Sequence, residues 1–282
     1  MIRQLHIGIL VEQRYLTQAQ PAGLVAALSA KGHRATIIVP EIHLYSVKDD
    51  NWLDGLDAIV ARGRSWGLLS MLAWAETCGI STINSRSAIA SVHNKAEMAI
   101  ALASASIPIP HTFLNVTESL ASQITNESYP LILKPIFGDN CRGLQVVNAP
   151  RELSQLDWRE SAALAQQYLP NDGCDLKIYG IGAEVWIVRK PSPLGIYKAR
   201  QTDGSNVKAL RVEQVPTTPM FRELGRRCRA IFGLDFFGVD CVQTVDGPVV
   251  IEVNDFPNYS GVPDADEKLA DFVIRKARGE KP

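Results

Sequence analysis

The chain has 282 residues, a formal net charge of −1 and 21% charged residues. Its length suits two or three domains and leaves enough chain to bury a substantial core. The near-neutral charge gives no electrostatic reason to expect binding to nucleic acid or to a membrane surface, so local positive groups would have to bind any anionic ligand.

The five cysteines are scattered without C-x-x-C spacing and predict neither a disulfide framework nor a zinc site. The apolar run near the N-terminus is short and is followed directly by Glu12 and Arg14, unlike a signal peptide. No apolar stretch approaches the length of a membrane span. We therefore expect a protein of the reducing cytoplasm.

Roughly the first 85 residues alternate between predicted strands and helices, which argues for an α/β fold with a parallel sheet of about four strands. The expected strands are 5–11, 35–39, 56–61 and 80–84, and the expected helices are 21–31 and 68–77. An alanine-rich helix over 94–104 follows and is broken by Ile107-Pro108-Ile109-Pro110.

The remaining sequence mixes strands and helices in the manner of an α+β region. The expected strands are 131–136, 144–147, 164–170, 175–180 and 184–189, and the expected helices are 220–232 and 266–278. A last pair of β-branched runs, over 236–255, flanks an Asp-Gly dipeptide and predicts a β-hairpin.

Oxygen-bearing side chains alternate along the second strand of this hairpin. Glu252 and Asn254 point to one face, and Ile251 and Val253 to the other. Converging carboxylate and amide oxygens favour a hard cation such as Mg²⁺. The alternative is an edge hairpin whose acids are solvated, since a half-buried strand often alternates apolar and polar residues.

Whether Asp240 joins this face depends on the length of the hairpin loop. An odd loop, for example 245–247 with Gly247 in the left-handed region, places Asp240 opposite Glu252. A two-residue loop would direct Asp240 to the other side. The predicted magnesium site therefore requires an odd loop.

Lys134 lies inside an apolar strand, where a lysine must snorkel or meet an anion. The loop after it contains Gly138 and Gly143, which allow backbone N–H groups to approach a phosphate. A plain hairpin loop is the alternative, and the Walker ending is absent. Lys95 alone is equally compatible with a solvated helix residue.

Several short motifs follow one another in a characteristic order. They are Asn94-Lys95, the 107–110 break, Leu133-Lys134-Pro135, Gln166-Gln167-Tyr168-Leu169, Gly173-Cys174-Asp175-Leu176-Lys177, Gly238-Val239-Asp240 and Ile251-Glu252-Val253-Asn254. In this order the chain resembles the ATP-grasp superfamily over nearly its whole length, and its RimK-like amino-acid and peptide ligases in particular.

This resemblance implies an ATP-grasp fold. An N-terminal Rossmann-like parallel-sheet domain would span 1–86. Two α+β subdomains would clasp ATP: a central one over 87–168 with the glycine-rich lid loop, and a C-terminal one over 169–282 with the magnesium site.

The same resemblance implies the residues of the ATP site. Lys95 and Lys134 would hold the phosphates, the loop from Gly138 to Gly143 would close over them, and Asp175 would contribute to nucleotide binding. The hinge Gln167, Tyr168 and Leu169 would line the adenine. Asp240, Glu252 and Asn254 would bind two Mg²⁺ ions, for which Mn²⁺ could substitute. Arg211 would bind the transferred phosphoryl group, and the alternatives for this role are Lys198, Arg200 and Lys208.

In these ligases a carboxylate attacks the γ-phosphate, and an amine converts the resulting acyl phosphate to an amide, with release of ADP and phosphate. The resemblance therefore implies a small substrate bearing a carboxylate, plus an amine, and no nucleophilic side chain. The oligomeric state is left open, with a homodimer as one option.

Two other functions compete with the ligase. The segment 256–263 resembles the inositol-phosphate kinases of the same superfamily, so a kinase that phosphorylates a hydroxyl of a small polyol or sugar phosphate is the alternative. The segment 59–95 resembles the ligases and favours them. A non-catalytic ATP-binding protein is disfavoured because the three implied metal ligands are all present.

Gly63-Arg64-Ser65-Trp66-Gly67 matches the G-x-S-x-G motif of serine hydrolases. That class needs an acid and then a histidine after the serine, but no aspartate occurs between Ser65 and His111 and no histidine follows His111. A pair such as Glu76 with His93 is what remains, so a serine hydrolase that uses Ser65 is a remote alternative. We instead expect Arg62 and Arg64, at the carboxyl ends of sheet strands, to hold an acidic substrate. Ordinary surface arginines are the alternative.

Overall fold

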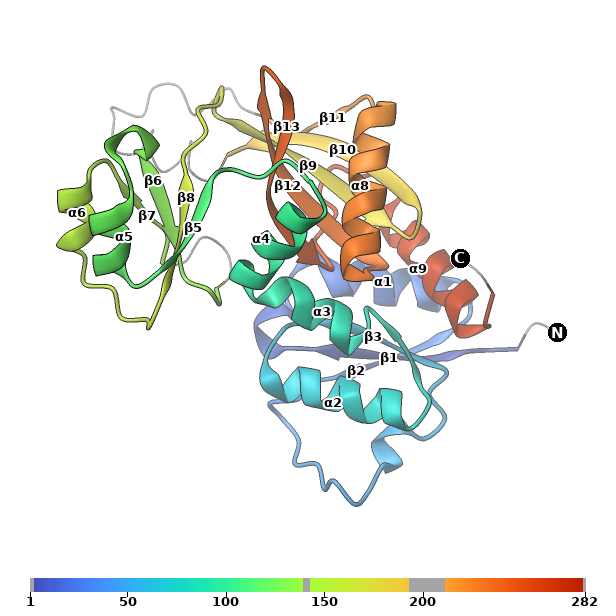
Figure 1. Cartoon of the computed structure of the whole chain (residues 1–282). Helices are drawn as coiled ribbons and strands as arrows, with labels where there is room; N and C mark the ends of the chain where they lie inside the picture. Colours follow the sequence, from blue (N-terminus) through green and yellow to red (C-terminus); the bar gives the residue numbers. More distant parts are fainter. Residues whose placement is uncertain (1–2, 139–142, 193–210, 281–282) are drawn as a thin grey trace.

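The computed structural model describes residues 3–138, 143–192 and 211–280. The described chain forms three β-sheets flanked by helices (Figure 1). Two of the sheets, described below as the first and the third, share a hydrophobic core. The sheet described second has a core of its own.

The first sheet is parallel, with the strand order β2-β1-β3-β4. Its elements are β1 (His6–Val11), β2 (Arg34–Ile38), β3 (Ala58–Arg62) and β4 (Ser81–Ile83), with α1 (Ala19–Ala30), α2 (Trp66–Thr77) and the short 3-10 helices Gln13–Tyr15 and Asn51–Leu53. The expected parallel sheet of four strands is confirmed.

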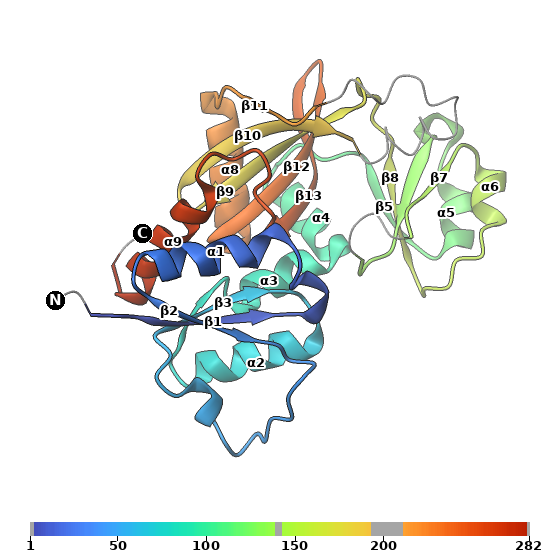
Figure 2. The same cartoon turned by 180° about the vertical axis from the view of Figure 1, so that it is seen from behind.

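Alternation along the buried strands explains how both faces of this sheet are covered. Ile7 and Val60 pack with α1 and with the C-terminal helix α9 (Ala265–Ala277), while Leu10 and Ile59 pack with α2. Figures 1 and 2 show α1 and α9 side by side on one face and α2 on the other. The last helix of the chain therefore returns to the first sheet.

The second sheet is antiparallel, with the order β5-β8-β6-β7. Its elements are β5 (Thr112–Asn115), β6 (Leu131–Lys134), β7 (Gln145–Val147) and β8 (Ala163–Gln167), with α5 (Thr117–Gln123), α6 (Pro150–Ser154) and the 3-10 helix Asn126–Ser128. Both helices cover the face turned away from the rest of the molecule (Figures 1 and 2). Their contacts with Leu131 and Leu133 form a separate small core.

The third sheet is antiparallel, with the order β11-β10-β9-β12-β13. Its strands are β9 (Cys174–Ile181), β10 (Glu184–Pro191), β11 (Glu213–Val215), β12 (Phe236–Thr244) and β13 (Gly247–Asp255), and its helices are α3 (Arg86–His93), α4 (Lys95–Ser104) and α8 (Pro219–Phe232). The three helices share one core with Val239 and Val253. On the opposite face, Tyr179 and Phe236 join the core of the first sheet.

Asn84, directly after β4, links the first sheet to the third. It is 1% exposed, its Oδ1 accepts the N–H groups of Asp235 and Phe236 at 2.6 and 2.9 Å, and its Nδ2 donates to the Phe236 carbonyl at 2.7 Å. One side-chain amide thus fixes the start of β12 against the end of the parallel sheet.

The long periodic elements follow the sequence expectation, whereas several short ones do not. The sequence did not predict α3, α5, α6, β5 or β11. Asn94 separates α3 from α4, and its Oδ1 caps α4 by accepting the N–H groups of Ala96 and Glu97.

Candidate functional site

A cavity of about 620 Å³ is lined by residues of all three sheets, among them Arg62 of β3, Lys134 of β6 and Glu252 of β13. The predicted site residues that line it are Lys95, Lys134, Gly138, Gln167, Tyr168, Leu169, Asp175, Asp240, Glu252 and Asn254. Segments more than 150 residues apart along the chain are thereby brought to one cavity, as the bond between Lys95 and Glu252 shows.

Gly143 and Arg211 are not among the lining residues. Gly143 has a φ of +75°, and a Cβ there would come within 2.8 Å of Pro135 Cγ, so only glycine fits beside that proline. Arg211 is exposed, although its neighbour Val212 reaches the cavity. The loop residues 139–142 and the alternatives Lys198, Arg200 and Lys208 lie outside the described residues.

The expected odd hairpin loop is wrong. Thr244 pairs with Gly247, so the turn contains two residues, with Gly247 at a φ of +119°. A β-bulge then shifts the register, because Cys241 pairs with Val250 whereas Asp240 pairs with Glu252. The extra residue of the bulge brings Asp240 opposite Glu252, as the odd loop was expected to do.

The bulge also changes the face of Ile251. The sequence predicts this residue on the side of Val253, but Ile251 lines the cavity together with Glu252 and Asn254. Val253 stays in the core, as expected. Two successive residues can face the same side here because strict alternation fails at a bulge.

Lysines neutralise both carboxylates of this hairpin. Lys95 pairs with Glu252, while Lys177 and Lys190 lie 2.7 and 3.3 Å from the two oxygens of Asp240. Asn254 Nδ2 also donates to Asp240, at 2.8 Å. Burial alone would raise the pKa of Asp240, but Lys177 and Lys190 outweigh it and hold that pKa below its ordinary value.

The donor set fits a hard cation, since two carboxylates and an amide oxygen line the same cavity. The side chains of Asp240 and Glu252 are 22% and 24% exposed, so the cavity reaches both. A bound cation would compete with the lysine amines for these oxygens.

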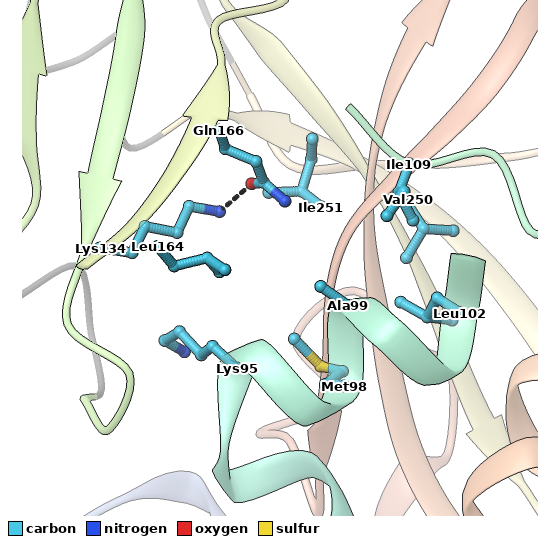
Figure 3. A pocket seen from close by; sticks show the side chains of 10 residues that line it. All are labelled: Lys95, Met98, Ala99, Leu102, Ile109, Lys134, Leu164, Gln166, Val250 and Ile251. Atoms are coloured by element: carbon cyan, nitrogen blue, oxygen red, sulfur yellow. Dashed lines mark hydrogen bonds between the residues drawn. The ribbon is translucent and has the colours of Figure 1, made fainter. Parts of the chain in front are cut away.

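A narrow apolar pocket lies beside the large cavity and shares Lys95, Lys134, Gln166 and Ile251 with it. Figure 3 shows the Lys134 amine pointing at the Gln166 side chain, whose Oε1 accepts its hydrogen bond. Lys95 and Lys134 are each only 5% exposed. Both amines are therefore presented to the cavity by buried stems rather than by mobile surface side chains.

The backbone around the predicted hinge is partly engaged. The Gln167 N–H donates to the His111 carbonyl and the Tyr168 N–H to the Pro130 carbonyl, each at 2.9 Å. Within the described part of the chain, the Leu169 N–H donates no backbone hydrogen bond.

Asp175, Lys177 and Tyr179 alternate along β9 and all line the cavity. Burial raises the pKa of the Asp175 carboxyl to about 6. Burial also lowers the pKa of the Lys177 amine. The cavity wall thus desolvates both groups.

Arg62, the last residue of β3, and Arg64 are buried, at 8% and 6% exposure, so they are not ordinary surface arginines. Arg64 Nε lies 2.8 Å from Asp255, and Arg64 Nη2 donates to Asn254 Oδ1 at 3.1 Å. Arg62 Nη2 donates to Asn258 Oδ1. Asp255 precedes the segment 256–263, which resembles the inositol-phosphate kinases in sequence, and Asn258 lies within it.

Ser65 of the G-x-S-x-G match is the N-cap of α2, and its Oγ accepts the Leu68 N–H at 3.3 Å. Its own N–H donates to buried Glu12. Gly63 has a φ of +145°, and a Cβ there would lie 2.5 Å from a Glu12 oxygen. Helix capping and close packing account for the motif.

Sequence reasoning did not assign roles to Lys190, Gln166 or Asp255, and it quoted Lys177 only as part of a motif. Period-two alternation was the available signal for Lys177, because it lies two residues after Asp175 on one strand. The pairing of Asp255 with Arg64 joins residues 191 positions apart and left no local signal.

Two antiparallel sheets and a parallel one surround a cavity in which lysines face carboxylates. This arrangement is the one expected of the class of ATP-grasp proteins. A family model described as "RimK-like ATP-grasp domain" matches residues 92–274. The chain belongs to the RimK-like ATP-grasp family of ADP-forming ligases.

The similar proteins support this assignment. A probable alpha-L-glutamate ligase of Maridesulfovibrio salexigens is 26% identical, covering 98% of this chain and 97% of its own. The RimK domain ATP-grasp protein of Sphaerobacter thermophilus has a TM-score of 0.71 at 23% identity, over 95% and 99% of the two chains. The ligase PsnB in complex with a minimal precursor, Mg and ADP also has a TM-score of 0.71, at 18% identity over 96% and 98%. The predicted ATP-grasp fold is confirmed.

A kinase is also among the relatives. Inositol-tetrakisphosphate 1-kinase 2 of Oryza sativa subsp. indica is 22% identical over 54% of this chain and 49% of its own. As for membranes, no helix within 3–138, 143–192 and 211–280 has the length and hydropathy needed to cross a bilayer.

Proposed function

We propose that the protein joins a carboxylate to an amine through an acyl phosphate, with release of ADP and phosphate. The observation that carries this proposal is the single cavity in which Lys95 and Lys134 face Asp240, Glu252 and Asn254. Phosphoryl transfer depends mainly on positioning and charge stabilisation, and these groups can supply both.

Lys95 and Lys134 would bind the ATP phosphates, and the loop from Gly138 to Gly143 would cover them. Gln167, Tyr168 and Leu169 would line the adenine. The Leu169 N–H is the best placed of the three to read the adenine edge, because the other two backbone N–H groups already donate to carbonyls.

Asp240, Glu252 and Asn254 would hold Mg²⁺, with two ions expected and Mn²⁺ as a substitute. When bound, these ions neutralise charge on the phosphate oxygens. The chain itself keeps the Asp240 carboxylate ionised, since Lys177 and Lys190 hold its pKa low. Asp175 would complete the wall beside the nucleotide.

Arg211 is proposed to steady the transferred phosphoryl group. Its exposure in this structure means that it would have to move toward the cavity, next to Val212. An Arg211→Ala variant should lower kcat more than it raises the KM for ATP, because such a contact would form mainly in the transition state.

The proposed substrates are a small molecule with a carboxylate and a second molecule with an amine. Several relatives are named as probable alpha-L-glutamate ligases, and PsnB forms a complex with a minimal precursor, so amino-acid or peptide substrates are the first to test. The cytoplasm is the proposed compartment, which the free cysteines 78, 174, 228 and 241 support.

The second candidate is a kinase that transfers the phosphoryl group to a hydroxyl. It is favoured by the similarity to the rice kinase and by the segment 256–263, which places Pro257, Asn258 and Ser260 in the cavity wall.

The test is a screen of the purified protein for ADP release with Mg²⁺ over amino acids, dipeptides and polyols, followed by mass spectrometry of the products. Condensation of two substrates supports the ligase, and a gain of one phosphate supports the kinase. Asp240→Ala and Glu252→Ala should abolish ADP release. Variants as fast as wild type would refute the metal assignment.

A further inference from the structure

Arg62 is an unusual cation in the cavity wall. It ends β3, is 8% exposed, and its guanidinium lies over the rings of Tyr15 and Phe256, with its Cζ 4.7 and 5.4 Å from the ring centroids. Burial lowers its pKa. The stem and plane of this side chain are therefore fixed by packing.

The hydrogen bonds of Arg62 go to neutral groups. Nη2 donates to Gln18 Oε1 at 2.9 Å and to Asn258 Oδ1 at 3.0 Å. Nε is buried and donates no hydrogen bond among the described residues. Asp255 attracts the Arg62 guanidinium electrostatically, but its ion pair is with Arg64. Glu12 is likewise occupied, by Arg14 and by backbone N–H groups.

Among the described residues, the charges that line the cavity do not balance. Six of these lining residues are cationic, namely Arg62, Arg64, Lys95, Lys134, Lys177 and Lys190, and four are carboxylates, namely Asp175, Asp240, Glu252 and Asp255. Asp240, Glu252 and Asp255 face the lysines 177, 190 and 95 and Arg64. Within the described part of the chain, the hydrogen bonds of Arg62 instead go to side-chain amides, which orient a cation without neutralising it.

We propose that Arg62 binds a carboxylate of the substrate that takes no part in the reaction. The preferred substrate then carries one carboxylate beyond the reacting groups, and Arg62 selects it. Lys134 receives phosphate at one side of the cavity, and Arg62 is a second, separate anion position. A planar guanidinium suits a carboxylate because it can donate two parallel N–H bonds.

This inference rests on the proposed function, because it assigns one wall of the same cavity to the substrate. It assigns different roles to Arg62 and Arg64, for which the sequence alone predicts the same role. Arg64 already holds Asp255 and Asn254 and serves to position them. Arg62 is the specificity-determining residue.

The experiment uses substrate pairs that differ only in charge. L-glutamate and L-glutamine are one such pair, with ADP release and product mass as readouts. Wild type should prefer the charged member by at least about 10-fold in kcat/KM, the lower end of what an unpaired buried polar group costs. In Arg62→Gln the ratio should fall to about 1, while the KM for ATP stays unchanged.

A second variant guards against misfolding. Asn258→Asp keeps Arg62 and its packing but adds a carboxylate 3.0 Å from Nη2. It should abolish the preference just as Arg62→Gln does. Arg34→Gln is the matched control, because Arg34 is an exposed arginine at the opposite end of the same sheet, and its ratio should equal that of wild type.

Contrary results are clear. The proposal is wrong if wild type does not discriminate within the pair, or if the preference survives in both Arg62→Gln and Asn258→Asp. If no ligase product forms at all, the proposed function fails, and thermal shifts with glutarate and its monoamide still decide the subsite. A glutarate-specific shift that Arg62→Gln removes supports it, and a shift that is absent or unchanged in the variant overturns it.

Discussion

At the scale of single residues, the cavity holds buried ionisable groups, and burial couples their protonation to folding. Asp175 is the most perturbed carboxyl with a defined value, because burial raises its pKa to about 6 from an ordinary value of 3.8. Asn171 Nδ2 donates to this carboxyl at 3.0 Å, and the Ser192 side chain also forms a hydrogen bond with it. A buried carboxyl of this kind makes stability depend on pH.

The sign follows from proton binding. The folded state keeps the Asp175 proton to a higher pH than the unfolded state does, so this group lowers the free energy of unfolding as pH rises from about 4 to about 6. Asp175→Asn should remove that loss. In urea unfolding, the free energy of unfolding of the variant relative to wild type should rise between pH 5 and pH 7, by at most about 3 kcal/mol. An exposed control, Asp157→Asn, should show no such gain. If the free energy of unfolding changes equally with pH in Asp175→Asn and in wild type, the raised pKa of Asp175 is contradicted.

A second prediction at this scale concerns Asn84. In Asn84→Ala, two N–H groups and one carbonyl lose a partner in a buried site. We expect a loss of about 2–4 kcal/mol in the free energy of unfolding, since each buried unsatisfied group costs about 1–3 kcal/mol. Asn148→Ala, on the surface, should cost less than about 1 kcal/mol in the same urea titration. Equal losses would show that the junction is not held by this amide.

At the scale of elements, the sequence predicted what is periodic and missed what depends on distant partners. The parallel strands, α8 ending at Gly233 and the closing hairpin follow from local pattern. The bulge at Ile251 does not, because its register is set by the packing of β13 on β12 rather than by the turn. The short α5 and α6 also escaped, since seven and five residues carry little periodicity.

The candidate site divides in the same way. Lys95, Lys134, Asp240, Glu252 and Asn254 could be found because a family resemblance fixes their order. The arginine pair could be placed at a sheet edge but not separated, because only the structure shows Asp255 on Arg64. Sequence alone cannot reveal which of two neighbouring cations is already neutralised.

Element geometry leads to a prediction for the hairpin. Gly238, on β12, has Lys177 Cε 2.7 Å from the place of a Cβ. Gly238→Ala should push Lys177 away from Asp240, and we expect ADP release to fall by roughly 10-fold or more because displaced site residues lose much of their effect. Gly67→Ala, on α2, would place its Cβ no closer than 4.0 Å to any described side chain beyond its two chain neighbours and should leave the rate unchanged. A full rate in Gly238→Ala would show that Lys177 tolerates displacement.

At the scale of the whole molecule, one core joins elements from both ends of the chain. Phe272 of α9 is 1% exposed and packs against Phe236 of β12, with ring centroids 5.3 Å apart, in the same core as Ile7 and Val60. The proposed domain boundaries at residues 86 and 168 therefore divide the chain by sequence position. The helix α9 belongs to the last subdomain by that division, but it packs on the first sheet.

This shared core predicts a coupled loss of stability. Phe272→Ala should cost about 3–5 kcal/mol, the usual range for a buried phenylalanine. Hydrogen exchange should quicken in β1 and β3 as well as in β9 and β12, while β6 and β8 keep their protection. Phe113→Ala, in the second sheet, is the converse control. Loss of protection confined to α9 would contradict the coupling.

The separate core of the second sheet has a consequence for how the enzyme works. Among the described residues, the core that contains Leu131, Leu133 and Ala165 includes no residue of the other two sheets. The first and third sheets, in contrast, share a core that includes Phe272 and are joined by the Asn84 hydrogen bonds. We expect the first and third sheets to act as one rigid body. We then expect the second sheet to swing as a unit when a nucleotide is admitted or released. Lys134, the amine proposed to bind phosphate, and Gln166, which accepts its hydrogen bond, would move together in that single motion.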